Sequence, residues 1–278
     1  MEVILSAALL VIGLVMLCFG GNWLVSGGVG IAKKFRISNL VIGLTIVAYG
    51  TSTPELAASI AAAGDHGAII LGNIIGSNIA NVGMVIGVSA ILIPVAIQKS
   101  VFRKEIPIML GVSLLLVLLS IDGELSQYDG ALLLVGLGVF AFFTFRDALK
   151  QRTTTQDNSE NTQNNIYVKY FGLIGIGIVV LYIGAILTVD NAVIIASEFG
   201  LSEKLIGLTV IAIGTSLPEL ITSIIAIRKG HSDVGIGNII GSNIYNILMI
   251  MGVGAALGGV LTTSDVYVDY AIMIIFSL

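Results

Sequence analysis

Long apolar segments recur along the whole chain and are separated by short polar connections. Apolar runs of about 18 or more residues are typical of helices that cross a bilayer. The pattern therefore predicts an all-α polytopic membrane protein in which each segment is one span. The expected spans are residues 3–30, 37–63, 68–97, 105–121, 128–147, 168–196, 203–227, 233–260 and 268–278.

The amino-acid composition agrees with this interpretation. Hydrophobic residues make up 56% of the chain and charged residues only 11%, and the mean hydropathy is +1.03. Soluble domains carry about 25% charged residues, so a soluble domain is excluded. The first apolar run lacks a basic leader and an A-x-A-like cleavage site, so we interpret it as a helix and not as a signal peptide. The single cysteine, Cys18, lies inside this helix, which excludes a disulfide framework.

Lysine and arginine gather in every second connection between the spans. Twelve of the thirteen lie in the connections 33–36, 99–104, 146–169 and 228–229, and only Lys204 lies elsewhere. Basic residues are enriched in cytoplasmic connections. We therefore expect the N-terminus outside and the 146–169 connection in the cytoplasm.

Two blocks of the first half recur in the second half. Residues 31–63 match 195–227 at 18 of 33 positions, and residues 67–92 match 232–257 at 14 of 26 positions. The matches keep Gly, Asn, Ser, Pro and Glu in register, which chance similarity between apolar helices would not do. The chain therefore contains an internal duplication.

The duplication is expected to be inverted, because one repeat holds five spans and the second copy then enters the membrane from the opposite side. We expect a first five-helix repeat at 1–150, a cytoplasmic linker at 151–166 and a second repeat at 167–278. The motif-bearing segments are 43–63, 72–92, 207–227 and 237–257. Two such repeats hold ten helices, so we expect the chain as given to end within the ninth helix, at Leu278.

A proline followed by a glutamate lies inside two of the spans, in GTSTPEL (50–56) and GTSLPEL (214–220). Proline has no N–H and displaces the carbonyl four residues earlier, which belongs to Gly50 or Gly214. Lipid cannot hydrogen-bond a freed carbonyl, so these carbonyls are candidate ligands. Further oxygens come from Thr51, Ser52, Glu55, Thr215, Ser216 and Glu219.

A second motif pair, GNIIGSNIANVG (72–83) and GNIIGSNIYNIL (237–248), supplies the opposing oxygens. Residues four apart share one helix face. The pairs with this spacing are Ser77 with Asn81 and Ser242 with Asn246. Asn78 and Asn243 point about 100° away, and we expect them to serve packing or gating.

Together these side chains are hard oxygen donors without a paired thiolate or a histidine. Such donors suit Ca²⁺ and Na⁺ and disfavour Zn²⁺ and Cu. Two carboxylates neutralise one Ca²⁺, and an ionised pair left empty in the membrane is strongly penalised. Na⁺ or protons must then replace Ca²⁺ when it leaves, which is the requirement of an antiporter.

The two motif pairs resemble the α-repeats of the cation/Ca²⁺ antiporter superfamily, and within it those of prokaryotic sodium/calcium exchangers. The resemblance covers nearly all of the chain and implies ten helices in two inverted five-helix halves in a prokaryotic cell membrane. It implies Ca²⁺ and Na⁺ as transported ions, no organic cofactor and no enzyme activity. The implied partners are the lipid bilayer and inorganic cations, without nucleic acid or an obligate protein partner. The long first and sixth helices would slide across the core to switch access.

The resemblance also implies a set of ion ligands, matched position by position. These are Ala48, Thr51, Ser52, Glu55, Ser77, Asn81, Ala212, Thr215, Ser216, Glu219, Ser242 and Asn246. The two glutamates, with the carbonyls of Thr51 and Thr215, would hold Ca²⁺, and Na⁺ would occupy overlapping and flanking sites. Some prokaryotic members carry Asp in place of Asn246, and this departure leaves the number of Na⁺ ions and the pH dependence open.

The sequence thus predicts a Na⁺/Ca²⁺ antiporter that extrudes Ca²⁺ with the Na⁺ gradient. The alternative is an antiporter that exchanges H⁺ for Ca²⁺ or another divalent cation, in which the glutamates bind protons. The hydroxyl and amide oxygens around the carboxylates favour Na⁺. A channel would leave the inverted repeats unexplained. An intramembrane hydrolase would need a nucleophile and a base, or an Asp pair, which two glutamates beside serines could mimic.

Overall fold

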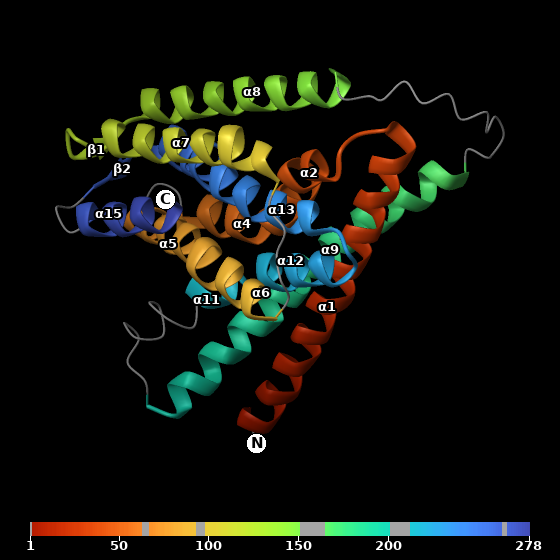
Figure 1. Ribbon diagram of the computed structural model, residues 1–278. Coiled ribbons are helices and arrows are strands. Elements are labelled where there is room, and N and C mark those ends of the chain that lie inside the picture. The colour runs from red at the N-terminus through yellow and green to blue at the C-terminus, as the bar shows by residue number, and fades with distance from the viewer. Residues whose placement is uncertain (1, 63–66, 93–97, 151–164, 201–211, 263–265) are drawn as a thin grey trace.

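The computed structural model describes residues 2–62, 67–92, 98–150, 165–200, 212–262 and 266–278, which are almost entirely helical (Figure 1). The helices of the first half, with π-helical turns marked η, are α1 (Glu2–Phe35), α2 (Asn39–Ile42), η1 (Gly43–Val47), α3 (Ala48–Thr51), α4 (Thr53–Ala62), α5 (Gly67–Ala80), η2 (Asn81–Ile86), α6 (Gly87–Leu92), η3 (Val101–Glu105), α7 (Ile106–Leu119) and α8 (Gln127–Lys150). Those of the second half are α9 (Asn165–Glu198), α11 (Ala212–Thr215), α12 (Leu217–Arg228), α13 (Ser232–Tyr245), η5 (Asn246–Met251), α14 (Gly252–Gly258) and α15 (Val266–Ser277).

These helices coincide with the apolar segments of the sequence wherever the structure describes them. In the part of the chain that the structure describes, five helical stretches are long and apolar enough to cross a membrane: Val3–Phe35, Ile70–Ile91, Gln127–Lys150, Tyr167–Glu198 and Ser232–Gly258. The start of the expected seventh span, 203–211, and linker residues 151–164 lie outside the described residues. The sequence did not predict the strands β1 (Glu124–Leu125) and β2 (Val260–Leu261), which form a short antiparallel pair.

The elements recur at the spacing of the sequence repeat. α3 ends at Thr51 and α11 ends at Thr215, 164 positions apart, and each ends one residue before a break. The breaks lie at Ser52 and Ser216, where ψ is close to zero. π-helical turns begin 165 positions apart, at Asn81 and Asn246. The two halves thus share local irregularities as well as helices.

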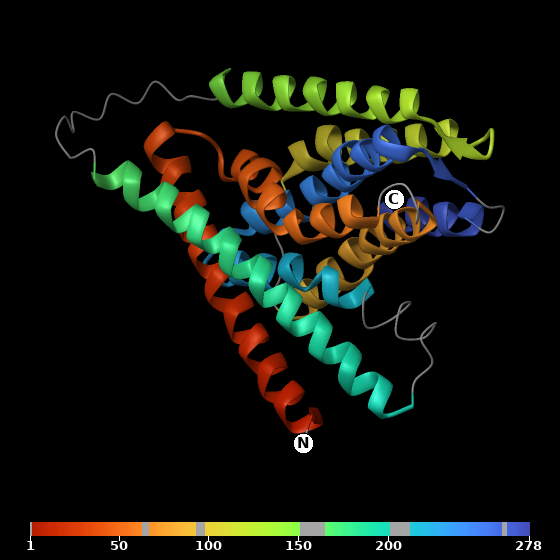
Figure 2. The ribbon, with the colours of Figure 1, turned by 180° about the vertical axis from the view of Figure 1, so that it is seen from behind.

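The long helices α1 and α9 cross each other closely and form an arm beside the other helices (Figures 1 and 2). Gly13, Gly20 and Gly27 follow one another at intervals of seven residues on α1, facing α9. A Cβ added at Gly20 would lie 2.8 Å from the Leu181 nitrogen and 2.9 Å from the Gly177 carbonyl oxygen. Glycine at this seam lets the two backbones touch, as small residues do between membrane helices.

α13 and η5 lie at the centre of the remaining helices. Residues 234–251 are all buried, so this segment is surrounded by protein. Gly237 and Gly241 of α13 pack against the backbone of the α2 to η1 segment, where a Cβ would lie 2.7 Å from the Leu40 oxygen and 2.8 Å from the Leu44 oxygen. The second-repeat motif is therefore held directly against the first repeat.

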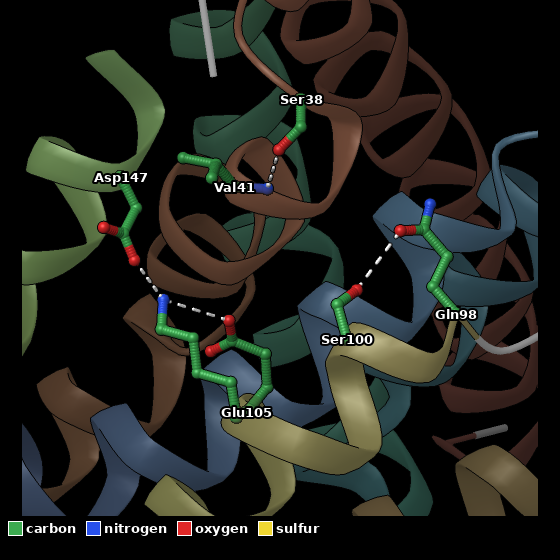
Figure 3. Close-up of polar contacts among 7 residues, drawn as sticks. Ser38, Val41, Gln98, Ser100, Glu105 and Asp147 are labelled. Atoms are coloured by element: carbon green, nitrogen blue, oxygen red, sulfur yellow. Dashed lines mark hydrogen bonds and ion pairs between the residues drawn. The ribbon is translucent and has the colours of Figure 1, made fainter. Parts of the chain in front are cut away.

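Polar contacts also join α8 to η3 and cap the start of α2. Lys104, in η3, pairs with Asp147 of α8 at 2.5 Å and with Glu105 at 3.4 Å (Figure 3). Ser38 caps α2 by accepting a hydrogen bond from the Val41 amide at 3.3 Å. These contacts lie outside the segments that carry the two motifs, so they support the scaffold and not the site.

Candidate cation site

Two helix breaks position the carboxylates of the site. The helix that begins at α2 stops at Ser52 and resumes as α4, and Glu55 lies in the first turn of α4. Glu219 lies in the same place in α12, which has Pro218 at its start. The proline cannot donate a backbone hydrogen bond, which favours a new helix start at this point. Each glutamate therefore lies at the N-terminus of a half-helix, and both side chains are only 1% exposed.

Glu219 receives hydrogen bonds from both repeats. Its Oε1 atom accepts from the Ser52 hydroxyl at 3.2 Å and from the Ser242 hydroxyl at 3.5 Å. Ser52 belongs to the first repeat, whereas Ser242 belongs to α13 of the second. The structure thus brings the first motif of one repeat beside both motifs of the other.

Thr51 and Thr215 meet asparagines of the opposite repeat. The Thr51 hydroxyl lies 3.1 Å from Asn238 Oδ1, 3.4 Å from the Ser242 hydroxyl and 3.2 Å from the Ala48 carbonyl. The Thr215 hydroxyl lies 3.4 Å from Asn73 Oδ1. The two threonines are therefore fixed by equivalent contacts.

Asn238 and Asn73 were not among the expected site residues. Asn238 also donates to the Glu219 backbone carbonyl at 3.4 Å and to the Ser223 hydroxyl at 2.9 Å, so it joins three parts of the site. The signal that could have identified them is their repetition 165 positions apart, one turn before Ser77 and Ser242.

Asn81 and Asn246 use their amide nitrogens in bonds across the repeats. Asn81 Nδ2 donates to Asn243 Oδ1 at 3.0 Å, and Asn246 Nδ2 donates to Asn78 Oδ1 at 3.0 Å. Both residues also begin a π-helical turn, a local irregularity that is frequent at functional sites. The amide oxygens of both residues remain without a hydrogen-bond partner.

Several other buried oxygens of the expected ligands share this property. Within the described residues, the ligand atoms without a hydrogen-bond partner are Glu55 Oε2, Glu219 Oε2, Asn81 Oδ1, Asn246 Oδ1, Ser77 Oγ and Ser216 Oγ. A buried polar atom without a partner carries a full desolvation penalty. A bound cation would remove this penalty for each atom that it contacts, because each of these atoms has a lone pair.

The two alanines of the expected ligand set have only backbone oxygens to offer. The Ala48 carbonyl already accepts the Ser52 amide at 3.0 Å and faces the Thr51 hydroxyl. In the second repeat the Ser216 amide bonds to the Ile213 carbonyl at 3.2 Å. The backbone around Ala48 and Ala212 therefore differs between the repeats.

The charge of the site calls for a cation. Among the described residues the ion pairs are those of Lys104, so neither Glu55 nor Glu219 faces a basic side chain. No cluster of three or more His, Cys, Asp or Glu occurs in the same part of the chain. An unpaired carboxylate in a membrane interior needs a counter-ion. A cage of two carboxylates and neutral oxygens suits a hard cation such as Ca²⁺ or Na⁺.

Inverted repeats, broken helices and a buried oxygen cage at their interface define a secondary transporter for cations. The chain belongs to the family described as sodium/calcium exchanger protein, whose profile matches residues 5–146 and 169–278. This membership confirms the superfamily expected from the two motif pairs and identifies a transporter, not an enzyme.

Individual relatives align over nearly the whole chain. The inner membrane protein YrbG of Escherichia coli K12 is 36% identical over 283 aligned positions, which cover 99% of this chain and 87% of YrbG. The sodium/calcium exchanger MaX1 of Methanosarcina acetivorans is 32% identical, over 88% of this chain and 81% of MaX1.

A solved structure confirms the fold class. The sodium-calcium exchanger NCX_Mj, soaked with Na⁺ and Sr²⁺, superposes with a TM-score of 0.83 at 36% identity, over 99% of this chain and 88% of that chain. The protein is therefore a helical integral membrane exchanger built from inverted repeats, and it exchanges cations.

Proposed function

We propose that the protein is a Na⁺/Ca²⁺ antiporter that extrudes Ca²⁺ with the inward Na⁺ gradient. The observation that carries the proposal is the pair of buried glutamates, one from each repeat, together with buried oxygen atoms of the same motifs that have no hydrogen-bond partner. The name of NCX_Mj as a sodium-calcium exchanger supports the same pair of ions.

In this proposal the transported ions bind at the interface of the two repeats. Glu55 and Glu219 supply the charge for Ca²⁺, together with the carbonyls of Thr51 and Thr215. The remaining ligands are Ser52, Ser77, Asn81, Ser216, Ser242 and Asn246, with backbone carbonyls of Ala48 and Ala212. Na⁺ ions occupy positions that overlap the Ca²⁺ position and flank it.

Exchange follows from the charge of this site. Two carboxylates without a cation are too unfavourable in a membrane for the site to change sides empty. With one Ca²⁺ or with Na⁺ ions bound the charge is balanced, so either load permits the change of access. The arm formed by α1 and α9 then slides along the core between the two loaded states. By the distribution of basic residues, the N-terminus lies outside and the 146–169 connection lies in the cytoplasm.

Transport into proteoliposomes tests the proposal. Vesicles loaded with Na⁺ should accumulate radiolabelled Ca²⁺ when diluted into Na⁺-free buffer, and collapse of the Na⁺ gradient should stop uptake. A pH gradient without Na⁺ should drive none. Uptake that requires the pH gradient and ignores Na⁺ would establish H⁺/Ca²⁺ exchange in place of Na⁺/Ca²⁺ exchange.

A second transport experiment distinguishes an antiporter from a channel. Unlabelled Ca²⁺ inside the vesicles should accelerate the entry of labelled Ca²⁺, because an exchanger moves ions in both directions through one site. A leak of Ca²⁺ that needs no counter-ion would contradict exchange.

A further inference from the structure

Asn78 and Asn243 contact each other across the interface of the repeats in a reciprocal way. Asn78 Nδ2 lies 3.3 Å from the backbone carbonyl of Asn243, and Asn243 Nδ2 lies 3.5 Å from the backbone carbonyl of Asn78. Both side chains are only 1% exposed. The two residues occupy equivalent positions, 165 residues apart, so the contacts follow a local twofold axis.

Two methionines complete this arrangement. Asn78 Nδ2 lies 3.8 Å from Met273 Sδ of α15, and Asn243 Nδ2 lies 3.5 Å from Met109 Sδ of α7. Met109 and Met273 are themselves 164 residues apart. An amide nitrogen has two hydrogens, and each nitrogen here faces two acceptors, a carbonyl oxygen and a thioether sulfur.

These neighbours permit one orientation of each amide. A carbonyl oxygen can only accept a hydrogen bond and a thioether sulfur is a weak acceptor, so the atom of Asn78 that faces them must be its nitrogen. The Oδ1 atom of Asn78 then faces Asn246 and accepts a hydrogen bond from Asn246 Nδ2 at 3.0 Å. The reverse orientation would place oxygen against oxygen and N–H against N–H. The same reasoning applies to Asn243 and Asn81.

We propose that Asn78 and Asn243 are positioning residues that turn the oxygens of Asn246 and Asn81 toward the transported cation. The nitrogens of Asn246 and Asn81 are held by their partners, and their oxygens are the buried atoms left without a hydrogen bond. Without the partner, either amide can rotate and present its N–H groups to the ion, which repels a cation. This inference rests on the proposed cation site and adds the residues that orient it.

Two substitutions at one position separate orientation from packing. Asn78→Ala removes most of the side chain together with its hydrogen bonds, whereas Asn78→Leu keeps the number and branching of the side-chain heavy atoms and removes the hydrogen bonds. We expect both to raise the apparent Kd for Ca²⁺ about ten-fold, because Asn246 loses its fixed orientation in each. The Kd is measured on purified protein in detergent from the rise of the melting temperature with added Ca²⁺. The equivalent pair, Asn243→Ala and Asn243→Leu, repeats the test in the other half.

A double-mutant cycle gives a readout that packing alone would not produce. A carboxylate presents an oxygen in either orientation, so its ligand function does not depend on Asn78. In an Asn246→Asp background, Asn78→Ala should therefore either raise the apparent Kd for Ca²⁺ by no more than about two-fold or lower it. The mirror cycle combines Asn243→Ala with Asn81→Asp.

The outcomes decide between the two explanations. Recovery of wild-type affinity by Asn78→Leu and Asn243→Leu, or equal weakening by Ala in the Asn and Asp backgrounds, would show a packing role and overturn the proposal. Unchanged affinity in all four single variants would overturn it as well. If the wild-type protein binds neither Ca²⁺ nor Na⁺, the proposed function itself fails, so that failure is distinct from failure of the positioning role.

Discussion

Glu55 and Glu219 are the ionisable side chains of the site, and in each of them the Oε2 atom has no hydrogen-bond partner. Replacing one of the two glutamates by a neutral residue leaves Ca²⁺ with only one of its two balancing negative charges. We expect Glu55→Gln and Glu219→Gln each to weaken Ca²⁺ binding by about 100-fold, which corresponds to ~2.7 kcal/mol. The weaker binding is measured as a rise in the Ca²⁺ concentration that gives half-maximal uptake by Na⁺-loaded proteoliposomes.

Glu105 offers a matched control for these variants. It is also a buried glutamate, 6% exposed, but it lies next to Lys104 and away from both motifs. Glu105→Gln should therefore keep Ca²⁺ uptake. Uptake at the wild-type rate by Glu55→Gln and Glu219→Gln would refute the ligand assignment.

Asn238 is the residue that connects most parts of the site. Asn238→Ala removes its contacts with the Thr51 hydroxyl, the Glu219 carbonyl and the Ser223 hydroxyl. We expect the variant to lower the free energy of unfolding by about 1–3 kcal/mol, because buried partners lose their hydrogen bonds. Thermal unfolding in detergent measures the effect. Asn73→Ala, its half-buried equivalent, should be milder, and an equal loss in both variants would contradict the special role of Asn238.

Residue chemistry could be predicted from the sequence where it is local. A glutamate after a proline inside an apolar span requires a polar site, so Glu55 and Glu219 were identifiable without a structure. The roles of Asn78 and Asn243 were not, because their partners lie in the opposite repeat. Helical spacing shows only that they face away from Ser77, and it does not show which helix lies on that side.

At the level of elements, the seam between α1 and α9 determines how the arm holds together. Gly20 contacts the backbone of α9 so closely that any side chain must push the helices apart. Gly20→Leu should lower the free energy of unfolding by about 1–3 kcal/mol, as overpacking does. Thermal unfolding in detergent measures this change as well.

Gly175 supplies the control for this seam. It is an exposed glycine of α9, and an added Cβ meets no described atom within 4 Å. Gly175→Ala should leave stability unchanged or raise it, because alanine favours a helix over glycine. If Gly175→Ala lowered the free energy of unfolding as much as Gly20→Leu, the close contact between α1 and α9 would not be the cause of the destabilisation.

The elements themselves were largely predictable, because apolar runs longer than a bilayer crossing indicate helices. Breaks at Ser52 and Ser216 follow from the prolines two residues later. The π-helical turns at Asn81 and Asn246 have no nearby proline that would have indicated them. The asparagine that begins each turn is instead hydrogen-bonded to the opposite repeat, which is a tertiary contact. The strand pair of β1 and β2 is also set by tertiary contact, because two residues carry no periodic pattern.

At the scale of the whole molecule, orientation in the membrane can be tested with the single cysteine. A Cys18→Ser variant provides a background without thiols, into which a cysteine is placed at exposed positions Asp122 or Lys150. In intact cells we expect a membrane-impermeant maleimide to label Asp122→Cys and to label Lys150→Cys only after lysis. The reverse pattern would show that the chain is inserted the other way round.

The contacts between Asn78 and Asn243 are the same in both directions, which is the property of an isologous interface between two identical copies. Each repeat thus holds an asparagine of the other by a hydrogen bond, Asn78 holding Asn246 and Asn243 holding Asn81, and in our proposal these bonds orient the oxygen ligands. A substitution in one half of the gene is therefore felt in the other half. Joint constraint on the two descendants of the duplication is the consequence we expect at these four positions.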